Sequence, residues 1–152
     1  MEPIRRFSPQ NYAAALESWS FLELSDKRPL FTSPFGDVFF ESNDGFWFLD
    51  LLAGEISRRW ETESDFSSSL NSREGQDEYL MIGLASEAES SGLRPGEAEV
   101  YSFRVPPALG GAVDLENVEL SDFVVAADIA RQLHQQIKDL PPGTPISGLS
   151  LT

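Results

Sequence analysis

Apolar side chains recur at helical spacing near the N-terminal end of the chain. Ser8, followed by proline, is a typical helix start, because the serine hydroxyl accepts a bond from a free N–H and proline fits the first helical position. Tyr12, Leu16 and Trp19 then fall on one face at spacings of four and three residues. The pattern predicts an N-terminal helix that ends near Leu24 and is followed by a polar loop.

A second helical pattern lies near the other end. Val125, Ile129, Leu133 and Ile137 repeat every four residues and form one apolar stripe. This spacing predicts a C-terminal helix. Pro141-Pro142-Gly143 ends it, because proline cannot continue a helix, and the tail beyond is expected to be extended.

The period of the pattern changes to two between residues 37 and 60. Residues 36–41 and 55–60 are typical of strands, and residues 46–49 are apolar on both faces, as in a central strand. Asp44-Gly45 has the chemistry of a tight hairpin turn. These segments predict a three-strand antiparallel meander at 37–60.

The remaining segments complete the predicted fold class. Residues 61–96 are polar and are expected to be helical in pieces, and residues 100–105 and 117–120 alternate as two further strands. Because the strands lie in hairpins, we expect an α+β fold. Its sheet would be antiparallel, mixed at most, with about five strands and with the N-terminal and C-terminal helices packed on it. A single domain over residues 1–152 is the simplest organisation.

The chain is strongly acidic. It has 25 Asp and Glu against 11 Lys and Arg, which gives a formal net charge of −14. Residues 61–152 hold sixteen acidic and five basic side chains, a net charge of −11, against −3 for residues 1–60. Negative charge of this size repels phosphate backbones and anionic lipids. We therefore expect no direct binding to nucleic acid or to membranes.

Few residues are suited to metal, cofactor or covalent chemistry. Cysteine is absent and His134 is the single histidine, which excludes disulfides and the usual cysteine and multi-histidine metal sites. Gly110-Gly111 lacks the flanking residues of a phosphate-binding loop, so a tight turn is expected there. No secretory signal or membrane helix is recognisable. We expect a cytoplasmic protein without cofactor, metal or membrane partner.

The candidate catalytic side chains have ordinary structural interpretations. His134 lies beside the apolar stripe, and no serine, threonine or carboxylate spacing singles out a partner for it. Asp37, Asp44 and Asp50 lie at predicted strand ends and turns, where aspartate bonds local backbone amides. We assign no catalytic residue and predict that the protein is not an enzyme.

An acidic segment is the strongest surface signal in the sequence. A solvated face that keeps the protein soluble is one interpretation. The other is a docking surface for a basic protein partner, because complementary potentials speed encounter and reject wrong partners. The candidate partner-binding residues are Asp77, Glu78, Glu87, Glu89, Glu97 and Glu99.

Several motifs, in order along residues 34–146, resemble a known bacterial family. They are Pro34 to Phe39, Gly45 to Asp50 with Gly54-Glu55-Ile56, Leu93 to Gly96, Tyr101 to Gly111, Asn117-Val118-Glu119, Gln132 to Ile137 and Leu140 to Thr144. The family was first catalogued as a domain of unknown function. It occurs as the C-terminal domain of immunity proteins that neutralise type VI secretion DNase toxins.

The resemblance implies a non-catalytic, cytoplasmic, mixed α/β protein that binds a cognate toxin and blocks it. DNases are usually basic where they grip DNA, and a chain with a net charge of −14 suits such a partner. One departure is that family immunity proteins place another, acidic type of domain upstream. Here residues 1–33 leave room for one helix and a loop.

Three hypotheses for function follow. The first is an immunity-type protein that neutralises a cognate secreted toxin, with a basic nuclease as one candidate, by stoichiometric occlusion. The second is a protein-binding or scaffolding domain with another ligand. The third and least favoured is a carboxylate-dependent hydrolase, because abundant acidic residues make a suitable pair easy to find. The oligomeric state does not follow from the sequence.

Overall fold

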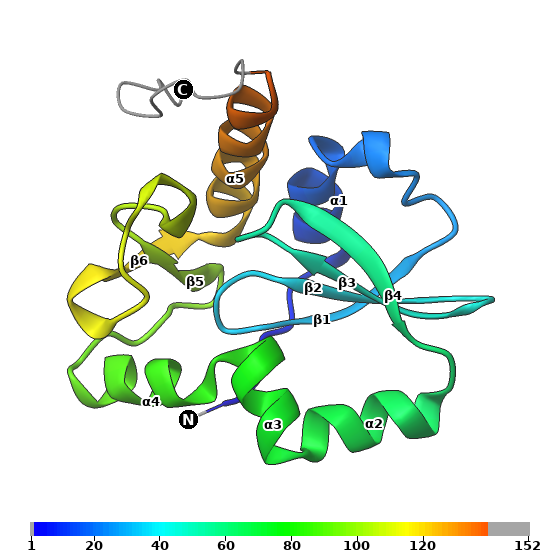
Figure 1. Cartoon of the computed structure of the whole chain (residues 1–152), viewed down its shortest axis with the longest axis horizontal. Helices are drawn as coiled ribbons and strands as arrows, with labels where there is room; N and C mark the ends of the chain where they lie inside the picture. Colours follow the sequence, from blue (N-terminus) through cyan, green and yellow to red (C-terminus); the bar gives the residue numbers. More distant parts are fainter. Residues whose placement is uncertain (1, 140–152) are drawn as a thin grey trace.

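A four-stranded antiparallel sheet lies at the centre of the structure, which is a computed structural model that describes residues 2–139 (Figure 1). Its strands follow one another in sequence order, so each neighbouring pair is joined by a short connection. The strands are β1 (Arg28–Thr32), β2 (Val38–Ser42), β3 (Gly45–Asp50) and β4 (Glu55–Trp60). The predicted meander is confirmed as β2 to β4, and β1 extends it by one strand.

The β2–β3 hairpin follows from its turn residues. Ser42 pairs with Gly45, so Asn43 and Asp44 form a two-residue turn. Gly45 adopts φ of +144°, and a Cβ there would lie 2.5 Å from the carbonyl oxygen of Trp60. Glycine is therefore required both by the backbone angle and by the close approach of β4.

Strand β1 was missed by the sequence prediction, which placed a polar loop there. Pro29 has no N–H to donate, and proline is rare inside sheets. It is accommodated because β1 lies at the edge of the sheet, so its missing donor interrupts no central ladder. The register of β1 against β2 also shifts between Pro29 and Phe31.

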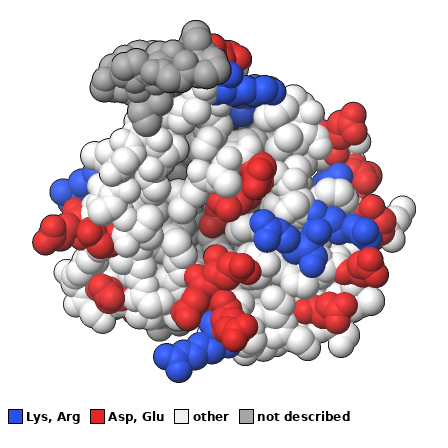
Figure 2. Space-filling view, viewed as in Figure 1, with Lys and Arg blue, Asp and Glu red and all other residues white. Residues whose placement is uncertain are grey.

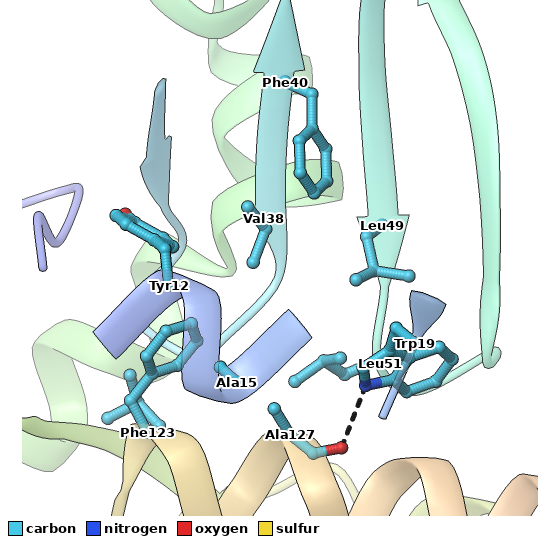
Figure 3. Close-up of a cluster of buried hydrophobic side chains, with 10 residues drawn as sticks. Tyr12, Ala15, Trp19, Val38, Phe40, Leu49, Leu51, Phe123 and Ala127 are labelled. Carbon is cyan, nitrogen blue, oxygen red and sulfur yellow. Dashed lines mark hydrogen bonds between the residues drawn. The ribbon is translucent and has the colours of Figure 1, made fainter. Parts of the chain in front are cut away.

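The N-terminal and C-terminal helices pack on one face of the sheet. They are α1 (Pro9–Glu17) and α5 (Phe123–Lys138). Trp19 is fully buried between them, and its Nε1–H donates to the carbonyl oxygen of Ala127 at 3.0 Å (Figure 3). Val38, Phe40, Leu49 and Leu51 from the sheet side complete this core, together with Tyr12, Ala15 and Phe123 (Figure 3).

Residues 61–96 form helical segments, as predicted, and these cover the opposite face of the sheet. An aromatic cluster fills this layer, and Phe46 stacks on Phe66 with ring centroids 4.6 Å apart. The segments are α2 (Glu63–Asn71), α3 (Arg73–Gly75), the π-helical turn η2 (Gln76–Leu80) and α4 (Ile82–Ser90). The side chain of Thr62 caps α2 by accepting a bond from the N–H of Asp65.

The two later strands form a second sheet of their own. β5 (Glu99–Phe103) and β6 (Val118–Asp122) pair antiparallel, from Glu99 opposite Asp122 to Phe103 opposite Val118. Together with α4 they enclose a third cluster that contains Phe35, Ala85 and Tyr101. The predicted fold class is confirmed, but the six strands form sheets of four and two instead of one sheet of about five.

Both terminal helices differ in detail from their predicted patterns. The first α-helix ends at Glu17, and a 3-10 turn, η1 (Ser20–Leu22), takes the chain on. In α5 the predicted stripe is partly in solvent, since Val125 is 49% exposed and Ile129 37% exposed. The small side chain of Ala127 is buried instead, which lets α5 lie close to α1.

Two short 3-10 turns, η3 (Pro107–Leu109) and η4 (Leu115–Asn117), connect β5 to β6. Among residues 2–139, no helix is long and apolar enough to cross a membrane. The predicted helix stop at 141–143 and the tail after it lie outside the described residues.

Candidate partner-binding surface

The six predicted partner-binding residues follow one another over three elements and a loop. Asp77 and Glu78 lie on η2, Glu87 and Glu89 on α4, Glu97 in the loop that follows α4, and Glu99 at the start of β5. Asp77, Glu78, Glu87 and Glu97 are exposed, whereas Glu89 and Glu99 are half-buried. Charges of both signs are visible on the face in Figure 2.

A basic residue from the N-terminal segment, Arg5, contacts the part of this surface that contains Glu97 and Glu99. The Nε of Arg5 donates to the carbonyl oxygen of Glu99 at 3.1 Å, and its Nη2 donates to the carbonyl oxygen of Gly96. The carboxylate of Glu99 turns back to accept the N–H of Gly96 at 2.8 Å. Arg5 therefore fixes the loop before β5 and adds a positive charge to a region that the sequence presents as acidic.

A small hollow of about 280 Å³ lies beside this loop. Its lining includes Glu89, Arg5, Arg94 and Tyr101, so charges of both signs border it. Burial raises the pKa of the Tyr101 hydroxyl, and the negative charge of Glu89 raises it further, while Arg5 and Arg94 oppose the shift. The hydroxyl donates to the carbonyl oxygen of Leu93 at 2.6 Å, which ties β5 to the loop after α4.

Glu78 is engaged at the other end of the surface. Burial raises the pKa of Tyr79, and a hydrogen bond and the charge of Glu78 add to this effect, whereas Arg59 on β4 opposes it. The guanidinium of Arg59 lies 5.8 Å from the centre of the Tyr79 ring. Glu78 is therefore partly committed to contacts within the protein.

Asp77, Glu87 and Glu97 are the acidic side chains best placed to meet a partner. All three are exposed, and none forms an ion pair with another residue of the described range 2–139. Other exposed acids are already paired, as Glu61 is with Arg58. The structure thus divides the predicted set into three outward-facing carboxylates and three that also serve the fold.

Residues 61–134 match the family described as T6SS immunity protein Tdi1, C-terminal. The predicted resemblance to this immunity-domain family is confirmed. The match runs from the end of β4 through most of α5 and includes all six predicted partner-binding residues. The matched family is one of T6SS immunity proteins.

The fold is similar to that of a known crystal structure. The chain is similar to the crystal structure of Atu4351 from Agrobacterium tumefaciens, with a TM-score of 0.54 and 18% sequence identity. The similarity covers 81% of this chain but 63% of that chain, so this protein spans less than two thirds of its neighbour. No match was found among curated proteins.

One motif within the Tdi1 C-terminal match has a structural explanation. Gly110 adopts φ of +92° at the end of η3, and a Cβ on Gly111 would lie 1.8 Å from the carbonyl oxygen of Val105. The Asn117 side chain braces this turn by bonding both the N–H and the carbonyl of Val105 and the carbonyl of Ala112. The expected tight turn is confirmed, and the glycines serve backbone packing.

Of the three turn aspartates, Asp50 bonds local backbone amides, as predicted. Asp50 accepts the N–H groups of Leu52 and Ala53, and Asp44 accepts the hydroxyl of Ser42. Asp37 differs in being buried: it accepts the N–H of Leu51 at 2.8 Å and the hydroxyl of Ser33 at 2.8 Å. Burial, and then the charge of Asp50, raise the pKa of Asp37 to about 7.

His134 makes a contact that the sequence did not reveal. Its Nε2 lies 2.9 Å from the carbonyl oxygen of Leu51, and because a carbonyl only accepts, this nitrogen carries the hydrogen. The same peptide group of Leu51 thus donates to Asp37 and accepts from His134. The bond joins α5 to the β3–β4 turn.

Proposed function

We propose that this protein binds a cognate secreted toxin and neutralises it as a non-catalytic, stoichiometric inhibitor that covers the toxin's functional surface. The observation that carries the proposal is the match of residues 61–134 to the Tdi1 C-terminal family of immunity proteins. The strong negative charge supports a basic toxin, with a DNase as the first candidate.

The proposed contact surface is the acidic set Asp77, Glu78, Glu87, Glu89, Glu97 and Glu99, all of which lie within the matched segment. The exposed carboxylates of this set, Asp77, Glu78, Glu87 and Glu97, attract a basic partner at long range and orient it before contact. We assign the largest contributions to Asp77, Glu87 and Glu97, because Glu78 and Glu99 also make contacts within the protein.

Neutralisation can be tested by co-expression with the product of the neighbouring toxin-like gene. We expect cells that express the toxin to survive only when the full chain is also present. We also expect the purified chain and the purified toxin to form a complex with one toxin per inhibitor chain. Survival that does not depend on the chain, together with no complex for any neighbouring effector, would remove the proposal.

The contact surface has a separate test. Glu87→Lys reverses one exposed charge on α4, and Glu55→Lys makes the same change at the exposed start of β4. We expect the first variant to weaken toxin binding by about tenfold and the second to leave it nearly unchanged. Equal effects of both variants would show that only net charge matters and not this surface.

A further inference from the structure

A large apolar groove is formed by residues 6–30, which precede the matched segment in the sequence. It is a groove of about 1100 Å³ between α1 and the edge strand β1. Phe7, Tyr12, Leu16, Leu24 and Leu30 contribute its apolar lining. Ala13 and Ala14, both exposed on α1, form part of its wall. In Figure 1 the chain loops out after α1 before it returns to β1.

A groove of this size and polarity is typical of a binding surface, because monomers seldom leave large apolar hollows open to water. The free edge of β1 is not suited to pairing with an added strand from a partner. Pro29 has no N–H, and the carbonyl oxygen of Leu30 already lies 3.4 Å from Nη1 of Arg6. The occupant must therefore bind through side chains more than through an added strand.

Charge distinguishes between the possible occupants. Residues 1–33, which supply every residue of the groove, contain four basic and four acidic side chains, so their net charge is zero. The whole net charge of −14 lies in the rest of the chain. A basic toxin is attracted to the acidic part of the molecule, whereas this neutral face lets two identical acidic molecules approach.

The borders of the groove are also self-complementary. Arg6 lies on the side of β1 together with Arg28, which is already paired with Glu41, and Glu17 and Glu23 lie on the side of α1 and η1. A two-fold axis would place the basic border of one copy against the acidic border of the other. Phe21 of η1 adjoins Ser20 of the groove lining and remains 54% exposed, although the guanidinium of Arg131 lies 4.2 Å from the centre of its ring.

We propose that two copies of this chain associate through the groove between α1 and β1, with η1 and Phe21 of each copy in contact with the groove of the other. None of the six acidic residues of the proposed toxin surface lines this groove, so the two proposed sites use different residues. This inference is independent of the proposed function, because it rests on the neutral N-terminal segment alone.

Analytical ultracentrifugation of the full chain over a wide range of concentrations tests the dimer. We expect the wild-type protein to shift from monomer to dimer as concentration rises. Ala13→Glu places a charge inside the contact at an exposed helical position, so the fold should survive while dimerisation weakens about tenfold or more. Phe21→Ser should act in the same direction.

Ser68→Glu is the matched control, because it adds the same charge at an exposed position of the distant helix α2. It should dimerise like the wild type, and circular dichroism should show all variants folded. A wild-type chain that stays monomeric, or equal effects of Ala13→Glu and Ser68→Glu, would overturn the proposal. Loss of toxin binding in Ala13→Glu with a monomeric wild type would also overturn it, since the toxin would then occupy the groove.

Discussion

Single residues in this protein show how a surface group and a buried group of the same type differ. Asp44 and Asp37 both lie next to strand ends, yet the pKa of Asp44 is lowered, first by its bond from Ser42, while burial raises that of Asp37. The carboxylate of Asp37 has two donors but little water, so its charged form is costly in the folded state. Folding therefore favours the protonated form of this side chain.

This buried carboxyl predicts a specific pH dependence. Because the pKa of Asp37 is raised in the folded state, its proton is lost more easily on unfolding, and the free energy of unfolding falls as pH rises from about 4 to about 7. The full effect is roughly 4 kcal/mol. We expect Asp37→Asn to flatten this slope, as measured by urea unfolding at a series of pH values.

Asp114→Asn is a suitable control, because this aspartate is exposed and its side chain does not cap η4. The control should keep the wild-type slope. An Asp37→Asn protein whose stability falls with pH as steeply as the wild type would show that Asp37 titrates normally.

At the scale of elements, short connections determine how the layers meet. The β3–β4 turn packs directly on α5, since a Cβ at Gly54 would lie 2.3 Å from Cγ of His134. Gly54 also adopts φ of +71°, a backbone region that favours glycine. This turn and the bond from His134 to Leu51 together hold α5 in place.

Gly54→Ala should therefore destabilise the protein for two separable reasons. The left-handed backbone costs about 1 kcal/mol for a residue with a Cβ, and the clash with the His134 ring adds a similar amount. Thermal and denaturant unfolding of Gly54→Ala, His134→Ala and the double variant would separate them. The clash should disappear when His134 is truncated, so strictly additive effects would contradict the packing described.

At the scale of the whole molecule, charge is divided between two regions. Residues 1–33 are neutral, and the later residues carry the net charge of −14. The two proposed surfaces follow this division, since the toxin surface lies in the acidic part and the dimer groove in the neutral part. Salt should consequently affect the two associations differently.

We expect the association rate with a basic toxin to fall by about tenfold or more between low and physiological salt, with a smaller change in the dissociation rate. Dimerisation through the neutral groove should change much less over the same range. Stopped-flow or biosensor kinetics and ultracentrifugation at matched salt concentrations would measure both. A toxin association rate that does not depend on salt would exclude the electrostatic part of the proposal.

The amino-acid sequence by itself determined the elements whose signals are local. The Asp44-Gly45 turn, the strands on either side of it, the cap of the first helix and the glycine turn at 110–111 were all predicted correctly, because each depends on neighbours in the chain. The resemblance to the immunity-domain family was also recognisable from ordered motifs, and residues 61–134 match that family.

The tertiary structure decided what depends on distant contacts. Pro29 concealed β1, which is stable because an edge strand needs no donor there. Ala127 is buried and Val125 is exposed because α1 lies against α5. The spacing of apolar residues within α5 gives no information about where α1 packs. Burial around Asp37, the bond from His134 and the approach of Arg5 to the acidic loop likewise join residues far apart in sequence, so only the folded chain could bring their charges together.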